Sequence, residues 1–131
     1  MTKLEKVFRS ILGKNPLYMR PPSGEYDSTT LTTLGELGYK VILWDIDSND
    51  WRYKDQSSLS HEQANYKSVI EEDSKKNPQG HIALQHDVHK KTVEKLVPWV
   101  ISYVKSKKNY KFVSVAECLG NTKGSAYKTK K

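Results

Sequence analysis

The sequence predicts an α/β protein in which about four parallel strands alternate with helices. Two observations lead to this fold class. Segments whose apolar residues recur at helical spacing alternate along the chain with short runs of β-branched and aromatic residues. The run at 39–46, "YKVILWDI", is too apolar for one-sided burial, so it suits a parallel strand covered on both faces. Strict alternation implies a parallel sheet with right-handed crossovers.

The first element is predicted to be an amphipathic helix at the N-terminus. Thr2 and Glu5 have the spacing of a capping box, and Gly13 is a stop signal. The apolar residues of this helix fall on one face: Leu4, Val7, Phe8, Ile11 and Leu12.

A short strand and a second helix are expected next. The strand is "LYM" at 17–19, and it runs into "RPPSG" at 20–24, where two prolines exclude both helix and sheet interior. Asp27 can cap a helix that Gly38 ends, and the apolar run "YKVILWDI" follows as the second strand.

The remaining elements continue the alternation. A third helix begins near Ser60 and is broken by "KKNPQG" at 75–80, before a strand at 81–86. A fourth helix carries apolar residues at helical spacing, and Pro98 should kink it or split it from its first turn. The last predicted strand is "YKFVSV" at 110–115.

Composition indicates one folded domain with a heavily charged surface. The 131 residues carry a formal net charge of +7, from 22 basic and 15 acidic residues. Four lysines lie in the last eleven residues without an acid: Lys123, Lys128, Lys130 and Lys131. We therefore expect a basic, disordered tail at 121–131, and no specific nucleic-acid partner, because lysines alone give only salt-sensitive, unspecific affinity.

Other features of the sequence concern redox state and location. Cys118 is the only cysteine, so no intrachain disulfide is possible. No apolar run reaches membrane-spanning length, and the N-terminus lacks the apolar block and cleavage site of a signal peptide. We expect a soluble, unexported chain without a membrane partner.

Polar side chains collect where the first three predicted strands end. Arg20 follows the first strand, Asp47 the second and His86 the third. Parallel α/β folds build their sites at the carboxyl ends of strands. The sequence therefore predicts a guanidinium, a carboxylate and an imidazole at one face of the sheet.

Each of these residues has a structural alternative. His86 could be a surface histidine, and Arg20 could cap carbonyl groups. Asp47 could cap the loop "DSNDW", which is rich in turn-forming residues. Asp87 is better explained as the N-cap of the following helix. Trp51 lies in a polar loop after a strand end, and it could equally belong to the core or to the wall of a ligand pocket.

A metal site built from histidines is disfavoured. His81 and His86 are five residues apart on one strand, so they point to opposite faces. His89 lies beyond the following turn. We expect no three-histidine metal site in this chain.

Three segments in this order and spacing, "MRPPSG", "DSNDW" and "LQHD", resemble motifs three, four and five of the polysaccharide deacetylases, carbohydrate esterase family 4. Longer stretches, "YMRPPSGEYD", "IALQHDVH" and "YKFVSVAECLG", are especially similar to fungal chitin deacetylases. The resemblance runs from the first helix to about Gly120. It implies that 1–120 is the C-terminal part of a catalytic domain with a partial (β/α) barrel.

The resemblance also implies a reaction. Members of this family remove N-acetyl groups from N-acetylglucosamine polymers with a divalent metal, usually zinc. Metal-bound water attacks the acetamide carbonyl, an aspartate takes its proton, and a histidine protonates the departing amine. By position, His86 resembles that general acid, Asp47 the carboxylate that orients it, and Arg20 the arginine that holds the catalytic aspartate.

The same resemblance suggests residues that contact the substrate. Trp51 and Leu84 match the wall of the pocket for the acetyl methyl group. Ser23 stands where relatives usually have tyrosine, and the backbone N–H there helps hold the oxyanion. Chitin is the best-fitting polymer, while peptidoglycan and xylan deacetylases share the three motifs.

One departure from the family pattern is large. The family's first motif supplies the base aspartate and one metal ligand, its second supplies two metal-binding histidines, and neither occurs in this sequence. We therefore expect that the chain alone binds no metal and is inactive, and that its partner is the missing N-terminal half. The alternatives are a non-catalytic carbohydrate-binding relic and a non-functional gene fragment.

The resemblance leaves two further expectations. Complete relatives are secreted or associated with the cell wall. Secreted fungal relatives often pair a C-terminal cysteine with one upstream, so Cys118 is either half of such a pair or a half-buried free thiol.

Overall fold

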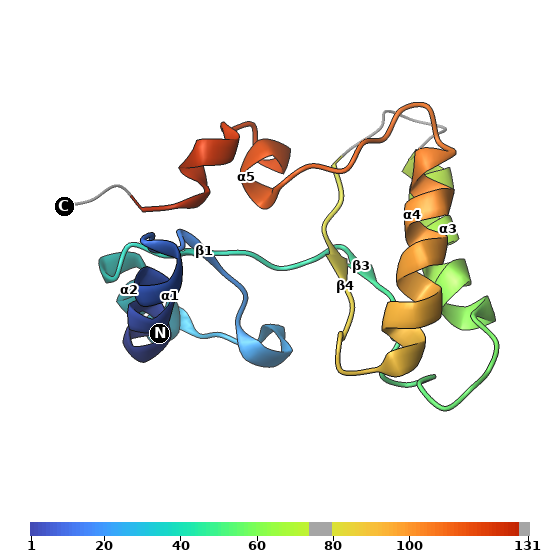
Figure 1. Cartoon of the computed structure of the whole chain (residues 1–131), viewed down its shortest axis with the longest axis horizontal. Coiled ribbons are helices and arrows are strands. Elements are labelled where there is room, and N and C mark those ends of the chain that lie inside the picture. The colour runs from blue at the N-terminus through green and yellow to red at the C-terminus, as the bar shows by residue number, and fades with distance from the viewer. Residues whose placement is uncertain (74–79, 129–131) are drawn as a thin grey trace. The chain divides into compact units, whose positions relative to one another are not determined.

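The computed structural model describes residues 1–73 and 80–128, which fall into two compact units. The first unit comprises Met1–Leu43 with the segment from Val113 onward, and the second comprises Trp44–Phe112. Each unit contains one pair of parallel strands. The predicted α/β class and parallel pairing are therefore confirmed, and the pair β3–β4 is labelled in Figure 1.

The first unit contains mainly short elements. They are α1 (Thr2–Leu12), β1 (Tyr18–Met19), the 3-10 turn η1 (Pro22–Gly24), α2 (Ser28–Glu36), β2 (Lys40–Val41), α5 (Val115–Cys118) and the 3-10 turn η3 (Lys123–Ala126). Helix α1 begins at Thr2 itself, so the predicted cap by Thr2 is wrong. Asp27 caps α2 as predicted, because its Oδ1 accepts the Thr30 N–H at 2.7 Å.

The C-terminal segment of this unit differs from the predicted tail. The Lys128 N–H donates to Asn15 O at 2.9 Å, and the Lys128 Nζ lies 2.8 Å from Glu5 Oε2. The same ammonium group lies 3.5 Å from the centroid of the Tyr39 ring. Residues 123–128 are thus held to the start of the chain rather than disordered, and 129–131 lie outside the described residues.

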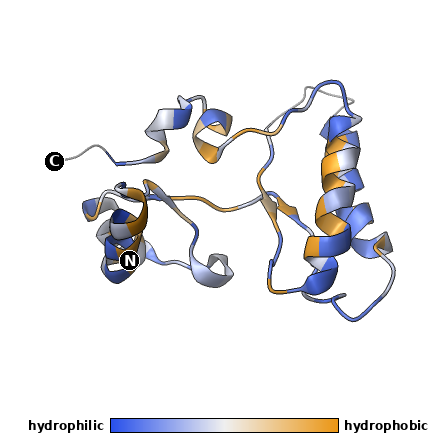
Figure 2. Cartoon of the chain, in the orientation of Figure 1, coloured by the Kyte–Doolittle hydropathy of each residue, from blue (hydrophilic) through white to orange (hydrophobic). Residues whose placement is uncertain are grey.

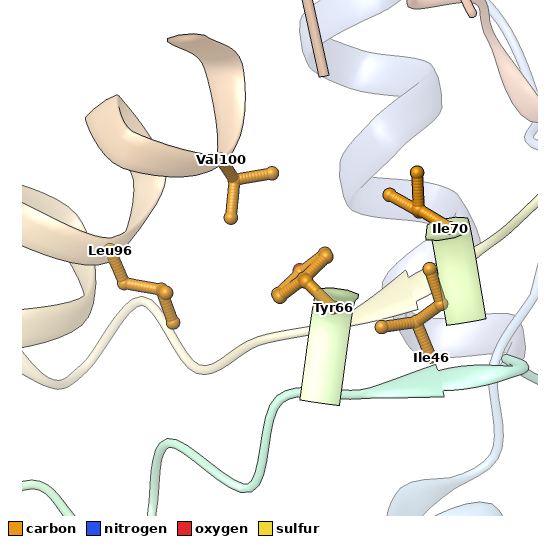
Figure 3. Packing of buried hydrophobic residues seen from close by; sticks show 5 residues of the cluster. All are labelled: Ile46, Tyr66, Ile70, Leu96 and Val100. Carbon is orange, nitrogen blue, oxygen red and sulfur yellow. The ribbon is translucent and has the colours of Figure 1, made fainter. Parts of the chain in front are cut away.

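The second unit carries the main hydrophobic core. Its elements are β3 (Ile46–Asp47), α3 (Ser60–Asp73), β4 (Ala83–Leu84), a π-helical stretch η2 (Thr92–Leu96) and α4 (Val97–Lys105). Figure 1 shows α3 and α4 side by side, and Figure 2 shows the hydrophobic residues that α4 carries. Five buried side chains converge from four elements of this unit, β3, α3, η2 and α4 (Figure 3): Ile46, Tyr66, Ile70, Leu96 and Val100.

Two predicted strands take a different form. The run "YKVILWDI" is divided, because Ile42 N–H donates to Met19 O while Asp45 N–H donates to Ile82 O. The run "YKFVSV" is not a strand. Ser114 instead forms a capping box with Glu117 that starts α5, and 110–114 pair with no strand of the described residues.

The fourth helix is interrupted where proline predicts it. Helical structure changes from η2 to α4 at Val97, and Pro98 lies in the first turn of α4, where its missing N–H is tolerated. Helical conformation begins at residue 90, so Asp87 lies in the preceding turn and is not the predicted N-cap.

Two further expectations can be compared with the fold. Cys118, at the end of α5, carries a free thiol that is partly buried. Across the described part of the chain, each helix is too short or too polar to span a bilayer.

Candidate active site

In the second unit, the side chain of Asp50 is hydrogen-bonded to His86 at two points. His86 follows β4, and Asp50 lies in the loop after β3. The His86 ring Nδ1 is 2.7 Å from Asp50 Oδ1, and the His86 backbone N–H donates to Asp50 Oδ2, also at 2.7 Å. The carboxylate therefore holds both the backbone and the ring of one residue, which fixes the orientation of the imidazole.

The two partners differ sharply in exposure. The Asp50 side chain is 1% exposed, whereas the His86 side chain is 38% exposed. Because Nδ1 faces the carboxylate, Nε2 is the ring nitrogen left for exchange of a proton with a bound molecule. The pair can thus hold an imidazole in one tautomer and present its other nitrogen.

Asp50 is buried but ionised. Burial alone would raise the pKa of Asp50, yet hydrogen bonds from the His86 N–H, the His86 ring and the Thr92 hydroxyl together hold the pKa of Asp50 below its ordinary value. Thr92 Oγ1 donates to Asp50 Oδ2 at 2.7 Å. The Trp51 N–H also donates to Asp50 Oδ1, at 3.0 Å. Four donors on one carboxylate offset the cost of burying its charge.

The low pKa of Asp50 leads to a prediction about acid stability. A carboxyl group with a lowered folded pKa contributes stability that is present above its unfolded pKa, about 3.9, and is lost as the pH falls through the folded value. We expect the stability of the second unit to fall below about pH 4, and Asp50→Asn to flatten this dependence. All three tryptophans, Trp44, Trp51 and Trp99, lie in this unit, so their fluorescence in urea titrations measures its unfolding. Equal slopes for the two proteins would contradict this assignment.

The loop that carries Asp50 is fixed at its first turn by Ser48. The Ser48 hydroxyl donates to Leu84 O at 2.8 Å, and the Ser48 carbonyl accepts the Asn65 side-chain amide at 3.1 Å. Ser48 is fully buried, and the next residue, Asn49, has a positive φ of 53°. Asparagine tolerates this conformation better than most residues, so the chain can turn there and bring Asp50 back toward His86.

The structure corrects the predicted partner of His86. The sequence assigned that role to Asp47, but Asp47 Oδ1 accepts the Asn49 N–H at 2.8 Å and closes the turn. Asp50 makes the contact with His86 instead. The structural alternative for Asp47, a cap of the loop "DSNDW", is the one observed.

Trp51 and Leu84 lie close in the chain to this pair. Trp51 directly follows Asp50 and is 47% exposed, and the Arg52 guanidinium lies 4.9 Å from the centroid of its ring. Leu84 pairs in register with Asp47 across the parallel strands β3 and β4. Both predicted pocket residues thus belong to the same unit as His86.

Arg20 and Ser23 belong to the first unit, so the site residues predicted from the sequence are divided between the two units. Ser23 is exposed and lies in η1 with a φ of 56°. A positive φ is strained for a residue with a side chain, and such strain concentrates at functional loops. Arg20 lies between β1 and η1 and is half-buried.

A buried ion pair contacts the loop 50–53. Lys91 Nζ lies 2.6 Å from Glu62 Oε1 and donates to Tyr53 O at 2.7 Å. The Glu62 side chain is 1% exposed and that of Lys91 8%. Lys91 and its neighbour Thr92 therefore contact the loop at two points, Tyr53 and Asp50.

The residues described do not form a metal site by themselves. Across 1–73 and 80–128, no three histidine, cysteine or acidic side chains gather closely enough to bind one ion. His81 illustrates the reason, because its Nδ1 contacts Asp45 while its Nε2 lies 3.0 Å from Asp73. The two carboxylates occupy opposite nitrogens of the ring and do not converge on a common point.

Sequence reasoning missed Asp50 and Thr92. Asp50 is the second acid of "DSNDW", three residues after Asp47, and its presence in that segment was the signal that could have identified it. Thr92 gave no signal, because a threonine near the start of an apolar helix is ordinary.

Comparison with known proteins shows similarity to polysaccharide deacetylases. The family model described as "Polysaccharide deacetylase" matches residues 1–42. A chitin deacetylase from Pestalotiopsis sp is 38% identical over 98% of this chain and 41% of its own length. A probable peptidoglycan-N-acetylglucosamine deacetylase from Arthroderma benhamiae is 36% identical over 98% of this chain and 28% of its own length.

A solved structure is similar over nearly the whole chain. The chitin deacetylase from the fungal pathogen Colletotrichum lindemuthianum superimposes with a TM-score of 0.86 and 34% identity, over 98% of this chain and 55% of that structure. The chain thus spans less than half the length of the two relatives compared by sequence, and about half of the solved structure.

Proposed function

We propose that this chain forms part of the catalytic domain of an enzyme that removes N-acetyl groups from an N-acetylglucosamine polymer. Its similarity in sequence and in fold to polysaccharide deacetylases supports this proposal. The observation that carries the proposal is the pairing of buried Asp50 with half-exposed His86. It supports a role for His86 as the general acid.

The chemistry requires such an acid. Hydrolysis of an N-acetyl group breaks a C–N bond, and the departing nitrogen must gain a proton because an amide anion is a very poor leaving group. Asp50 holds His86 through Nδ1, so Nε2 is the atom that delivers the proton. The buried carboxylate keeps the ring in this orientation throughout the reaction.

The remaining site residues have proposed roles in binding. Trp51 and Leu84 form the wall against the acetyl methyl group, and the exposed indole of Trp51 offers an apolar surface to a sugar. Ser23 contributes its backbone N–H to the developing oxyanion. Arg20 holds the base aspartate of the complete domain.

The acid is only one part of the required machinery. A divalent metal supplies the activated water in the family reaction, but the residues described do not fit a metal. We propose that the metal ligands and the base aspartate belong to another part of the same catalytic domain, since the Pestalotiopsis relative is more than twice as long as the stretch that this chain matches.

We expect the 131-residue chain alone to release no acetate from chitin oligosaccharides, with or without added zinc. General acid assistance contributes only about 10²–10⁴-fold, and it cannot replace the attacking group. The measurement is enzymatic detection of acetate. Zinc-dependent release that His86→Ala abolishes would show that this expectation is wrong.

The function itself is tested on the native protein from its source cells. Its mass and N-terminal sequence are determined, and its acetate release from chitin and peptidoglycan fragments is measured. A longer species with an aspartate-rich strand end and paired histidines, active on either polymer, supports the proposal. A native chain that begins at Met1 and releases no acetate overturns it.

The exposed indole favours a second candidate, a module that binds N-acetylated sugars without turnover. Quenching of tryptophan fluorescence by chitin oligosaccharides without metal, lost in Trp51→Ala, would support it.

A further inference from the structure

We propose that Thr92 is a positioning residue of this site, whose hydroxyl locks the Asp50 carboxylate in the orientation that holds His86. The geometric part of this inference stands on the contacts of the second unit, and its catalytic consequence rests on the function proposed above.

The contacts show what Thr92 adds, because its hydroxyl is the donor to Asp50 that comes from neither His86 nor the loop 50–53. Asp50 Oδ1 accepts hydrogen bonds from the His86 ring at 2.7 Å and from the Trp51 N–H at 3.0 Å. Oδ2 accepts two hydrogen bonds, from the His86 N–H and from the Thr92 hydroxyl, each at 2.7 Å. Rotation of the carboxylate about its Cβ–Cγ bond would break the bond to the ring, and each of these donors opposes it. The Thr92 hydroxyl opposes it at Oδ2, the oxygen that does not bind the ring.

Burial makes this hydrogen bond hard to replace. Thr92 is 2% exposed and Asp50 1% exposed, so water has no open route to the position of the hydroxyl. Loss of the donor would leave a buried carboxylate oxygen with one partner fewer, and groups buried without partners are costly. Of the charged groups, His86 contacts the carboxylate itself, and the ion pair of Lys91 with Glu62 contacts its loop at Tyr53 O.

The helix that carries Thr92 has an unusual start. Thr92 opens the π-helical stretch Thr92–Leu96, and its carbonyl accepts the Val97 N–H across the wider turn. Such turns often occur at functional sites. Lys91 contacts Tyr53 O and Thr92 contacts Asp50, so two successive residues hold the loop that carries Asp50 at both of its ends.

The test compares Thr92→Val, which keeps the shape and removes the hydroxyl, with Thr92→Ser, which keeps the hydroxyl. Each is made in the full-length protein labelled with ¹⁵N and ¹³C. The readouts are the Nδ1–H resonance of His86 and the titration of the Asp50 carboxyl carbon. Thr32→Val is the matched control, because its hydroxyl makes an exposed bond to Ser28 O in the first unit.

We expect T92V to weaken or broaden the His86 Nδ1–H signal and to shift the Asp50 titration to higher pH. T92S and the Thr32 control should match the parent protein. In an active preparation, T92V should lower kcat about tenfold with little change in KM, as for one lost hydrogen bond to a charged group. If T92V does not fold, Thr92→Ala replaces it.

The outcomes separate the two proposals. Unchanged His86 and Asp50 signals in T92V, or equal changes in T92S and T92V, would overturn the role of Thr92 whatever the activity. If the His86 and Asp50 signals change in T92V but the native protein releases no acetate, the positioning role of Thr92 stands and the proposed function is rejected.

Discussion

In a native protein with the proposed deacetylase activity, replacing His86 by glutamine is expected to lower kcat by about 10²–10⁴-fold, the usual contribution of a general acid. Glutamine keeps a polar side chain of similar length, but it cannot deliver a proton at neutral pH. Because the loss affects proton transfer rather than binding, KM for chitin oligosaccharides should change little. The measurement is the rate of acetate release at saturating substrate.

His89→Gln is the matched control for this substitution. The His89 ring lies 5.9 Å from that of His86 and belongs to the same unit. Of these two histidines, His86 is the one that is hydrogen-bonded to Asp50. The control should retain the activity of the parent protein. An equal loss of kcat in both variants, or full activity in His86→Gln, would reject His86 as the acid.

Lys91→Met is expected to lower the free energy of unfolding of the second unit by about 3–5 kcal/mol, the usual cost of breaking a buried ion pair by removing one partner. The substitution leaves Glu62 as an uncompensated charge at 1% exposure. It also removes the donor to Tyr53 O. Urea titration followed by tryptophan fluorescence measures the change.

Two further variants separate charge from packing. Lys90→Met removes the neighbouring lysine, which is 83% exposed and 3.8 Å from Glu94, and it should cost at most about 1 kcal/mol. The double variant Lys91→Met with Glu62→Leu should recover most of the stability, because no buried charge then remains unpaired. A double variant as unstable as Lys91→Met would show that packing, not charge, is the cause.

Local features of the fold could be predicted because their causes lie within a few residues. Asp27 caps its helix through an N–H three residues away, and Pro98 marks the change of helix geometry by its own missing donor. The segment "YKFVSV" shows the limit of this approach. Its β-propensity is high, but Ser114 and Glu117 complete a capping box and no strand of the described residues pairs with it.

The candidate site was predictable in its residue types and only partly in its partners. The sequence indicated Asp47, the first acid of "DSNDW", as the carboxylate for the imidazole of His86, whereas the structure places Asp50 there. The turn at Asn49 decides between them, because Asp47 closes that turn and Asp50 reaches back to His86.

The sequence by itself determined the α/β class, the positions where strands give way to polar loops, and the presence of an imidazole at one of those positions, since these depend on local propensity and pattern. The tertiary structure alone decided which side chains meet. Thr92 reaches Asp50 across 42 residues, and Lys91 finds Glu62 in the interior, through contacts that exist only once α3 and η2 have packed around β3. Hydrogen bonds and burial between distant segments produce no periodic pattern in the sequence. The contacts that orient His86 therefore could not be predicted from the sequence.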